Sequence, residues 1–78
     1  MHSSLVHLNS LIFSSNLSEV PEAADRCLYD ILGQYDHSQM TIFTGLMEIL
    51  LDTEMSSLAS KMLKIVDLIK FPAKKAMV

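Results

Sequence analysis

Several residue types are scarce in this sequence of 78 residues: it contains one cysteine, two glycines, two prolines and no tryptophan. The single cysteine, Cys27, excludes an intrachain disulfide and is expected to be a buried thiol in a reducing compartment. The three histidines, His2, His7 and His37, share no metal-ligand spacing with Cys27. There is no glycine-rich phosphate loop, and no serine lies in a nucleophile-elbow context. We therefore expect no catalytic site, no metal and no cofactor, and a protein that is not an enzyme.

Positive charge is also scarce. The sequence contains six Lys and Arg residues and nine Asp and Glu residues, so its net charge is −3. Residues 1–60 have a net charge of −7, whereas residues 61–78 have a net charge of +4. Three lysines could form a basic tail that contacts phosphates: Lys70, Lys74 and Lys75. Because affinity for nucleic acid depends mainly on neutralising phosphates, the acidic body disfavours DNA binding, which stays a minor alternative.

Long hydrophobic runs are absent as well. The first fifteen residues, MHSSLVHLNSLIFSS, lack the cationic start of a signal peptide, and polar residues interrupt their apolar run. No segment approaches the roughly 18 apolar residues of a membrane span. We expect a soluble, cytoplasmic protein with no membrane contact and no small-molecule substrate.

What is present is a helical repeat of apolar residues at spacings of three and four. The pattern predicts an all-α fold, a short three-helix domain within a single domain over residues 1–78. The three helices are expected over about residues 21–34, 38–51 and 54–70. Residues 4–14 are expected to form a weak helical segment, and Pro72 to end the last helix. Residues 1–4 and 73–78 are expected to be flexible.

The stretch MTIFTGLMEILL, residues 40–51, has eight apolar residues among twelve. On a helix they fill an arc of roughly 200°, more than one neighbouring helix can cover. We divide the arc into two rows. The row expected to pack on the chain's own helices is Ile42, Leu46 and Ile49. The row expected to contact a second copy or another partner is Met40, Phe43, Met47, Leu50 and Leu51, which predicts a helical homodimer.

Four segments together resemble a known family. They are LNSLIFSSNL (8–17), EAADRCLYDIL (22–32), IFTGLMEILLDTE (42–54) and KMLKIVDLI (61–69). Their order and apolar spacing are similar to those of the small biofilm and acid-resistance regulators of enteric bacteria, the AriR/YmgB and YcgZ-like proteins. The resemblance implies a cytoplasmic, all-helical homodimer without enzymatic activity. It also implies a connector that modulates a signalling phosphorelay through contact with a regulatory protein.

The sequence thus predicts a non-enzymatic regulatory or connector protein that acts by protein–protein contact in a pathway for biofilm formation or acid resistance. Two alternatives stay open. One is a small helical subunit or chaperone of a secretion system, which would form an open polymer or an obligate heterodimer. The other is a DNA-associated regulator, whose binding would weaken steeply with salt.

Overall fold

The architecture comes from a computed structural model that describes residues 3–34 and 37–76, with side chains described as far as residue 69. This part of the chain is all helical and contains no strand. Its elements are α1 (Ser3–Phe13), the 3₁₀ turn η1 (Leu17–Glu19), α2 (Val20–Gln34), α3 (His37–Leu50) and α4 (Ser56–Ala76).

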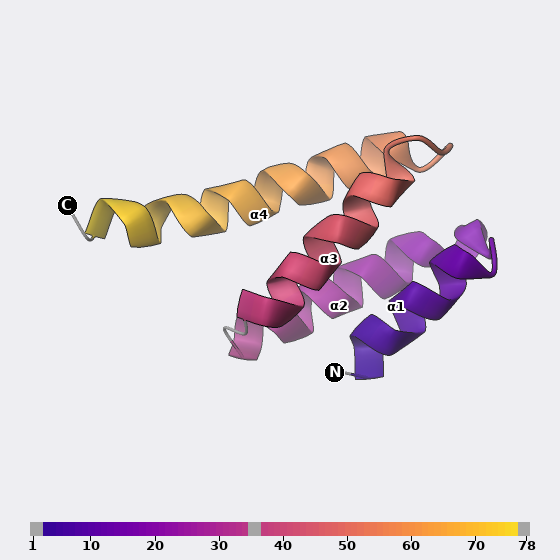
Figure 1. Ribbon diagram of the computed structural model, residues 1–78, viewed down its shortest axis with the longest axis horizontal. Coiled ribbons are helices and arrows are strands. Elements are labelled where there is room, and N and C mark those ends of the chain that lie inside the picture. The colour runs from indigo at the N-terminus through magenta and orange to yellow at the C-terminus, as the bar shows by residue number, and fades with distance from the viewer. Residues whose placement is uncertain (1–2, 35–36, 77–78) are drawn as a thin grey trace.

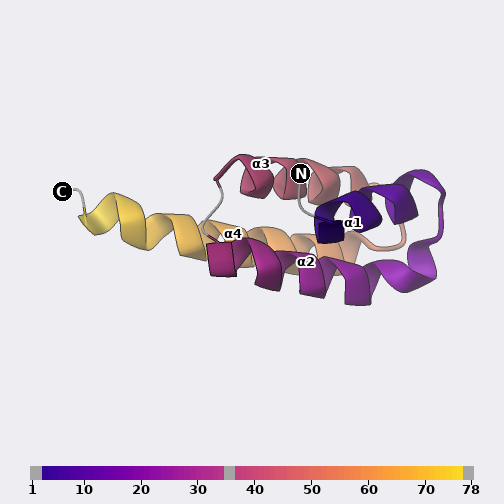
Figure 2. The same ribbon diagram turned by 90° about the horizontal axis from the view of Figure 1, so that it is seen from below.

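The four helices form two layers (Figure 2). Helices α1 and α3 lie in one layer, and α2 and α4 lie in the other. Because α1, α2 and α3 alternate in direction, α1 and α3 run the same way, side by side (Figure 1). Helix α4 packs mainly on α3, and its C-terminal half projects beyond the other helices. Helix α3 is therefore the central element, since α1 and α2 contact it as well as α4.

A left-handed turn joins α1 to α2. Ser15 has a φ of 61°. The N–H of Asn16 donates to the carbonyl of Leu11 at 2.9 Å, and the N–H of Ser15 donates to the carbonyl of Ile12 at 3.2 Å. These two bonds define the Schellman ending of a helix, with a serine where glycine is usual. The turn reverses the chain so that α2 can pack along α1.

Thr53 joins α3 to α4 with its side chain and its backbone. Its Oγ1 donates to the carbonyl of Leu50 at 2.7 Å and accepts from the N–H of Met55 at 3.0 Å. The N–H of Ser56 donates to the carbonyl of Thr53 at 3.1 Å. One residue therefore satisfies backbone groups at the end of α3 and ahead of α4, as helix ends require.

The core is entirely apolar among the described side chains. Its largest fully buried members come from three helices: Phe43, Leu5, Leu8, Ile31, Met47 and Leu50. Helix α4 contributes the buried Ala59, Met62 and Val66. No buried side-chain nitrogen or oxygen in the described part lacks a hydrogen-bond partner.

The helix count differs from the expected three. The weak segment over residues 4–14 is a full helix, α1, whose four buried residues are Leu5, Leu8, Leu11 and Ile12. The flanking serines gave it a low intrinsic propensity, but an apolar face packed on α2 and α3 stabilises it. Tertiary packing therefore outweighs local propensity at this end of the chain.

The predicted end of the last helix at Pro72 is wrong, because α4 continues to Ala76. Proline removes one intrahelical N–H, and an alanine- and lysine-rich segment favours helix on its far side. Of the segments expected to be flexible, residues 3–4 and 73–76 belong to α1 and α4. Residues 1–2 and 77–78 lie outside the described residues.

Candidate interaction surface

The described part of the chain offers no cluster of metal-ligating side chains. No group of three or more His, Cys, Asp or Glu residues there could hold a metal ion. No helix in that part is long and apolar enough to cross a bilayer. The features that could still form a site are Cys27 and the exposed apolar side chains.

Cys27 is a buried thiol on α2. Burial raises the pKa of Cys27, a hydrogen bond with Ser4 lowers it, and the negative charge of Asp30 raises it further, with a net increase. Only the thiolate is a good nucleophile or metal ligand. Cys27 therefore stays protonated at neutral pH and acts as a small core residue. This confirms the prediction from the sequence that the single cysteine is a buried thiol.

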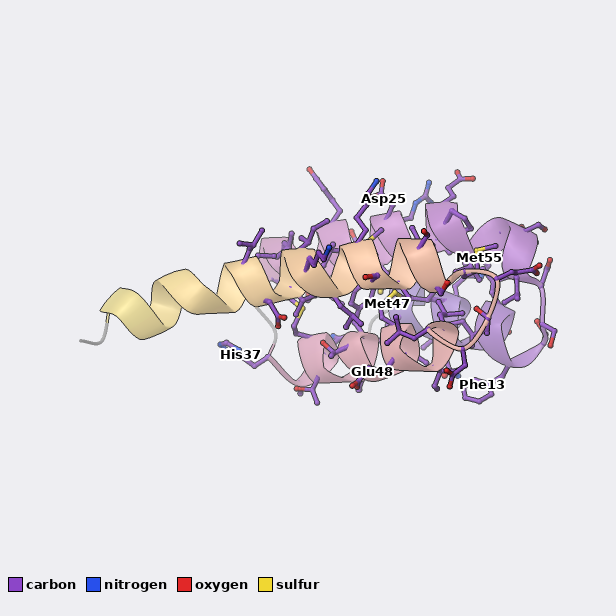
Figure 3. All side chains as sticks on the ribbon, turned by 90° about the horizontal axis from the view of Figure 1, so that it is seen from above. Phe13, Asp25, His37, Met47, Glu48 and Met55 are labelled. Atoms are coloured by element: carbon purple, nitrogen blue, oxygen red, sulfur yellow. The ribbon has the colours of Figure 1, made fainter. Side chains whose placement is uncertain are left out.

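The row of α3 expected to meet a partner lies mostly in the chain's own core. Met40, Phe43, Met47 and Leu50 are all buried, and only Leu51 is exposed, at 40%. Met47 lies on the side of α3 that faces the rest of the molecule (Figure 3). The prediction that this row as a whole faces a partner is therefore corrected.

The row expected to pack inside is mostly outside. Leu46 is buried, but Ile42 and Ile49 are 41% and 46% exposed. The physical reason is that α1, α2 and α4 together surround α3 and cover most of its apolar arc. The face left uncovered carries Ile42 and Ile49.

A second exposed apolar pair lies on α1. Val6 and Phe13 are 49% and 68% exposed. Like Ile42 and Ile49, they are seven residues apart, which places both on one side of their helix. Figure 3 shows Phe13 on α1 and Glu48 on α3 pointing out on the same side, away from α2 and α4.

We name this region the α1–α3 surface. It comprises Val6, Phe13, Ile42 and Ile49. Sequence patterns alone do not reveal this surface, because they predict only a weak helical segment over residues 4–14. Gly45 lies between the two isoleucines along α3, and no atom of this chain lies within 4 Å of the place where its Cβ would be. The glycine therefore does not mark a close helix contact inside the chain.

Formal charge is nearly absent from this layer. The 11 residues of α1 contain no Asp, Glu, Lys or Arg, and the 14 residues of α3 contain only Glu48. The remaining described charges lie on α2, α4 and the connecting turns. The molecule thus has one charge-poor layer and one charged layer.

Other exposed apolar side chains are isolated and lie among polar residues. Tyr29 on α2 is 79% exposed, and Leu68 on α4 is 67% exposed. Single exposed apolar residues of this kind are ordinary on protein surfaces. The basic tail residues Lys70, Lys74 and Lys75 lie in α4, outside the residues whose side chains are described.

Comparison with known proteins adds no relative. No protein-family model matches the chain, and no curated protein and no solved structure matches it significantly. The resemblance to the biofilm and acid-resistance regulators therefore stays a prediction.

Proposed function

We propose that this is a small, non-enzymatic regulatory protein that acts by protein–protein contact through the α1–α3 surface. The observation that carries the proposal is that α1 and α3, which adjoin in one layer, expose four large apolar side chains and carry only one formal charge. The buried centres of protein interfaces are depleted in charged residues, and contiguous apolar patches on soluble domains mark interaction sites.

The proposed setting is a cytoplasmic signalling pathway for biofilm formation or acid resistance, with a regulatory protein as partner. Its support is the order of the four apolar segments that resembles the enteric regulators. The all-helical architecture, with a helix for each segment, agrees with such a protein.

Deletion and complementation in the source cells test this proposal. We expect deletion to change biofilm mass and survival in acid, and the wild-type chain to restore both. A chain carrying Ile49→Asp should not restore them, whereas the matched variant Leu68→Asp, which alters an exposed apolar residue in the charged layer, should. Equal complementation by the two variants would contradict a role for the α1–α3 surface.

One alternative keeps a specific observation in its favour. Helix α4 projects from the body and carries the exposed lysines Lys61 and Lys64 in its described part. A DNA-associated regulator would use this helix, and its affinity would fall steeply as salt increases. Salt-insensitive or absent DNA binding, measured by fluorescence anisotropy, would remove this alternative.

A further inference from the structure

We propose that the face of α3 covered by α4 is a second docking site, which accepts a basic amphipathic helix of another protein when α4 opens. The inference goes beyond the proposed function, because this face is different from the α1–α3 surface. In the closed chain α4 occupies the site and competes with the partner helix. Docking of an amphipathic helix on an apolar face is a recurring mode of protein recognition.

Helices α1, α2 and α3 contain most of the core without α4. Each of these three helices contacts both of the others, whereas α4 packs mainly on α3. Of the nine largest fully buried side chains among the described residues, only Val66 lies on α4. An element with few neighbours can open while the rest of the fold stays closed. We therefore expect α4 to leave α3 without unfolding the other three helices.

The apolar stripe of α4 is incompletely buried on α3. Ala59, Met62 and Val66 are buried, but the apolar residues that flank them on the helix are only partly buried: Leu58, Leu63 and Ile65. Partial burial gains less free energy than full burial, so the docked state of α4 is less stable than its sequence would allow. Methionines in the shared core, Met47 and Met62, can repack around a helix of different shape.

The distribution of charge indicates that the partner helix is basic. Residues 1–60 have a net charge of −7, and residues 61–78 have a net charge of +4. Lys61 and Lys64 of α4 are exposed, away from its buried stripe. An acidic body attracts a basic helix and repels an acidic one. Helix α4 itself therefore shows the chemistry of the partner, with apolar residues on one side and lysines on the other.

Fluorescence anisotropy of a labelled peptide, measured with full-length chains, tests the proposal. The peptide has the sequence of residues 56–76 and serves as the probe for a basic amphipathic helix. The chains are the wild type, Met62→Ala, which weakens the docking of α4, and the control Leu68→Ala, which alters an exposed side chain. Apparent affinity rises with the fraction of chains whose site is open. Met62→Ala should therefore bind the peptide at least about 10-fold more tightly than the wild type and the control do.

Two changes in the peptide test the chemistry of the partner helix. Lys61→Glu combined with Lys64→Glu keeps the apolar stripe and reverses two charges. This peptide should bind the Met62→Ala chain about 10-fold more weakly at low salt, and the difference should shrink as salt increases. Val66→Asp places a charge in the apolar stripe, so a peptide with this change should not bind.

Any of four results overturns the inference. A peptide that binds no chain up to about 500 µM shows that α3 accepts no second helix of useful affinity. Equal binding to the wild type and Met62→Ala places the peptide elsewhere, on the α1–α3 surface if Ile49→Asp removes it. Hydrogen exchange that Met62→Ala accelerates equally in all helices shows that α4 cannot open alone. A Met62→Ala chain that sediments as a dimer and excludes the peptide has a second copy as occupant.

Discussion

At the scale of single residues, Ser15 has an unfavourable backbone conformation. Its φ of 61° lies in the left-handed region, where a side chain costs roughly 1 kcal/mol and glycine adopts the conformation freely. Ser15→Gly should therefore raise the free energy of unfolding by about 1 kcal/mol. Urea unfolding followed by circular dichroism measures the change.

Ser14 provides the matched control. Its φ is not positive, so glycine there adds flexibility to the unfolded chain without relieving a strained conformation. Ser14→Gly should leave stability unchanged or lower it. A gain of the same size in both variants would show that the left-handed turn is not the cause.

Cys27 makes stability depend on pH. Because burial raises its pKa in the folded chain, the thiol contributes stability that is complete below the unfolded pKa, ordinarily 9.0, and is lost as pH rises through the folded pKa. Cys27→Ala should therefore lose less stability than the wild type between about pH 8 and 10.5. Denaturant midpoints measured across this range give the difference, and parallel curves for the two chains would contradict it.

At the scale of elements, the turn between α3 and α4 depends on one hydroxyl group. Thr53→Val keeps the shape of the side chain but removes the donor to Leu50 and the acceptor for Met55. We expect a loss of about 1–2 kcal/mol in unfolding free energy.

The control for this variant is Thr41→Val. The Thr41 hydroxyl donates to the carbonyl of His37, one turn earlier in α3, and the side chain is exposed. Its removal should cost less than about 0.5 kcal/mol by thermal unfolding. If Thr53→Val and Thr41→Val lower the unfolding free energy by the same amount, the hydrogen bonds of Thr53 do not specifically stabilise the turn between α3 and α4.

The elements also show what periodicity can and cannot predict. Spacings of three and four predicted the all-α class and placed α2 and α3 to within one residue at each end. They could not orient α3, because an arc of roughly 200° fits several neighbours and either row can face inward. That choice depends on where α1, α2 and α4 pack, and burial of Phe43 rather than Ile42 is its result.

The sequence does contain one indication of the α1–α3 surface, which is the distribution of charged residues and not the spacing of apolar ones. Both α1 and α3 are almost free of charged residues, whereas α2 and α4 hold most of the charge. For α1, the serines lower the predicted helix content, so the sequence alone did not place Val6 and Phe13 on one exposed helix face. Whether the two helices adjoin is a property of the tertiary fold, so the surface could not be assembled from the sequence alone.

At the scale of the whole molecule, the two layers differ in the side chains that they expose to water. Helices α2 and α4 present charged side chains to water, while α1 and α3 present the α1–α3 surface.

Among the four helices, α4 has the fewest packing partners in the fold. It packs mainly on α3, whereas α1, α2 and α3 each contact both of the others. An element with few neighbours opens with a lower free energy than the rest of the fold. We therefore expect backbone amides of residues 60–69 to exchange with deuterium faster than buried amides of α2 and α3.

Met62→Ala tests whether this opening is local. Met62 is 4% exposed and belongs to the buried face of α4, and its truncation should cost about 2 kcal/mol or more of docking energy. Hydrogen exchange should then accelerate in α4 by about 10-fold or more, while α1 and α2 keep most of their protection. The exposed Leu68→Ala serves as control and should leave exchange nearly unchanged. Equal acceleration in all four helices would mean that α4 unfolds only together with the whole chain. The packing of α4 on α3 would then be too stable for α4 to open locally.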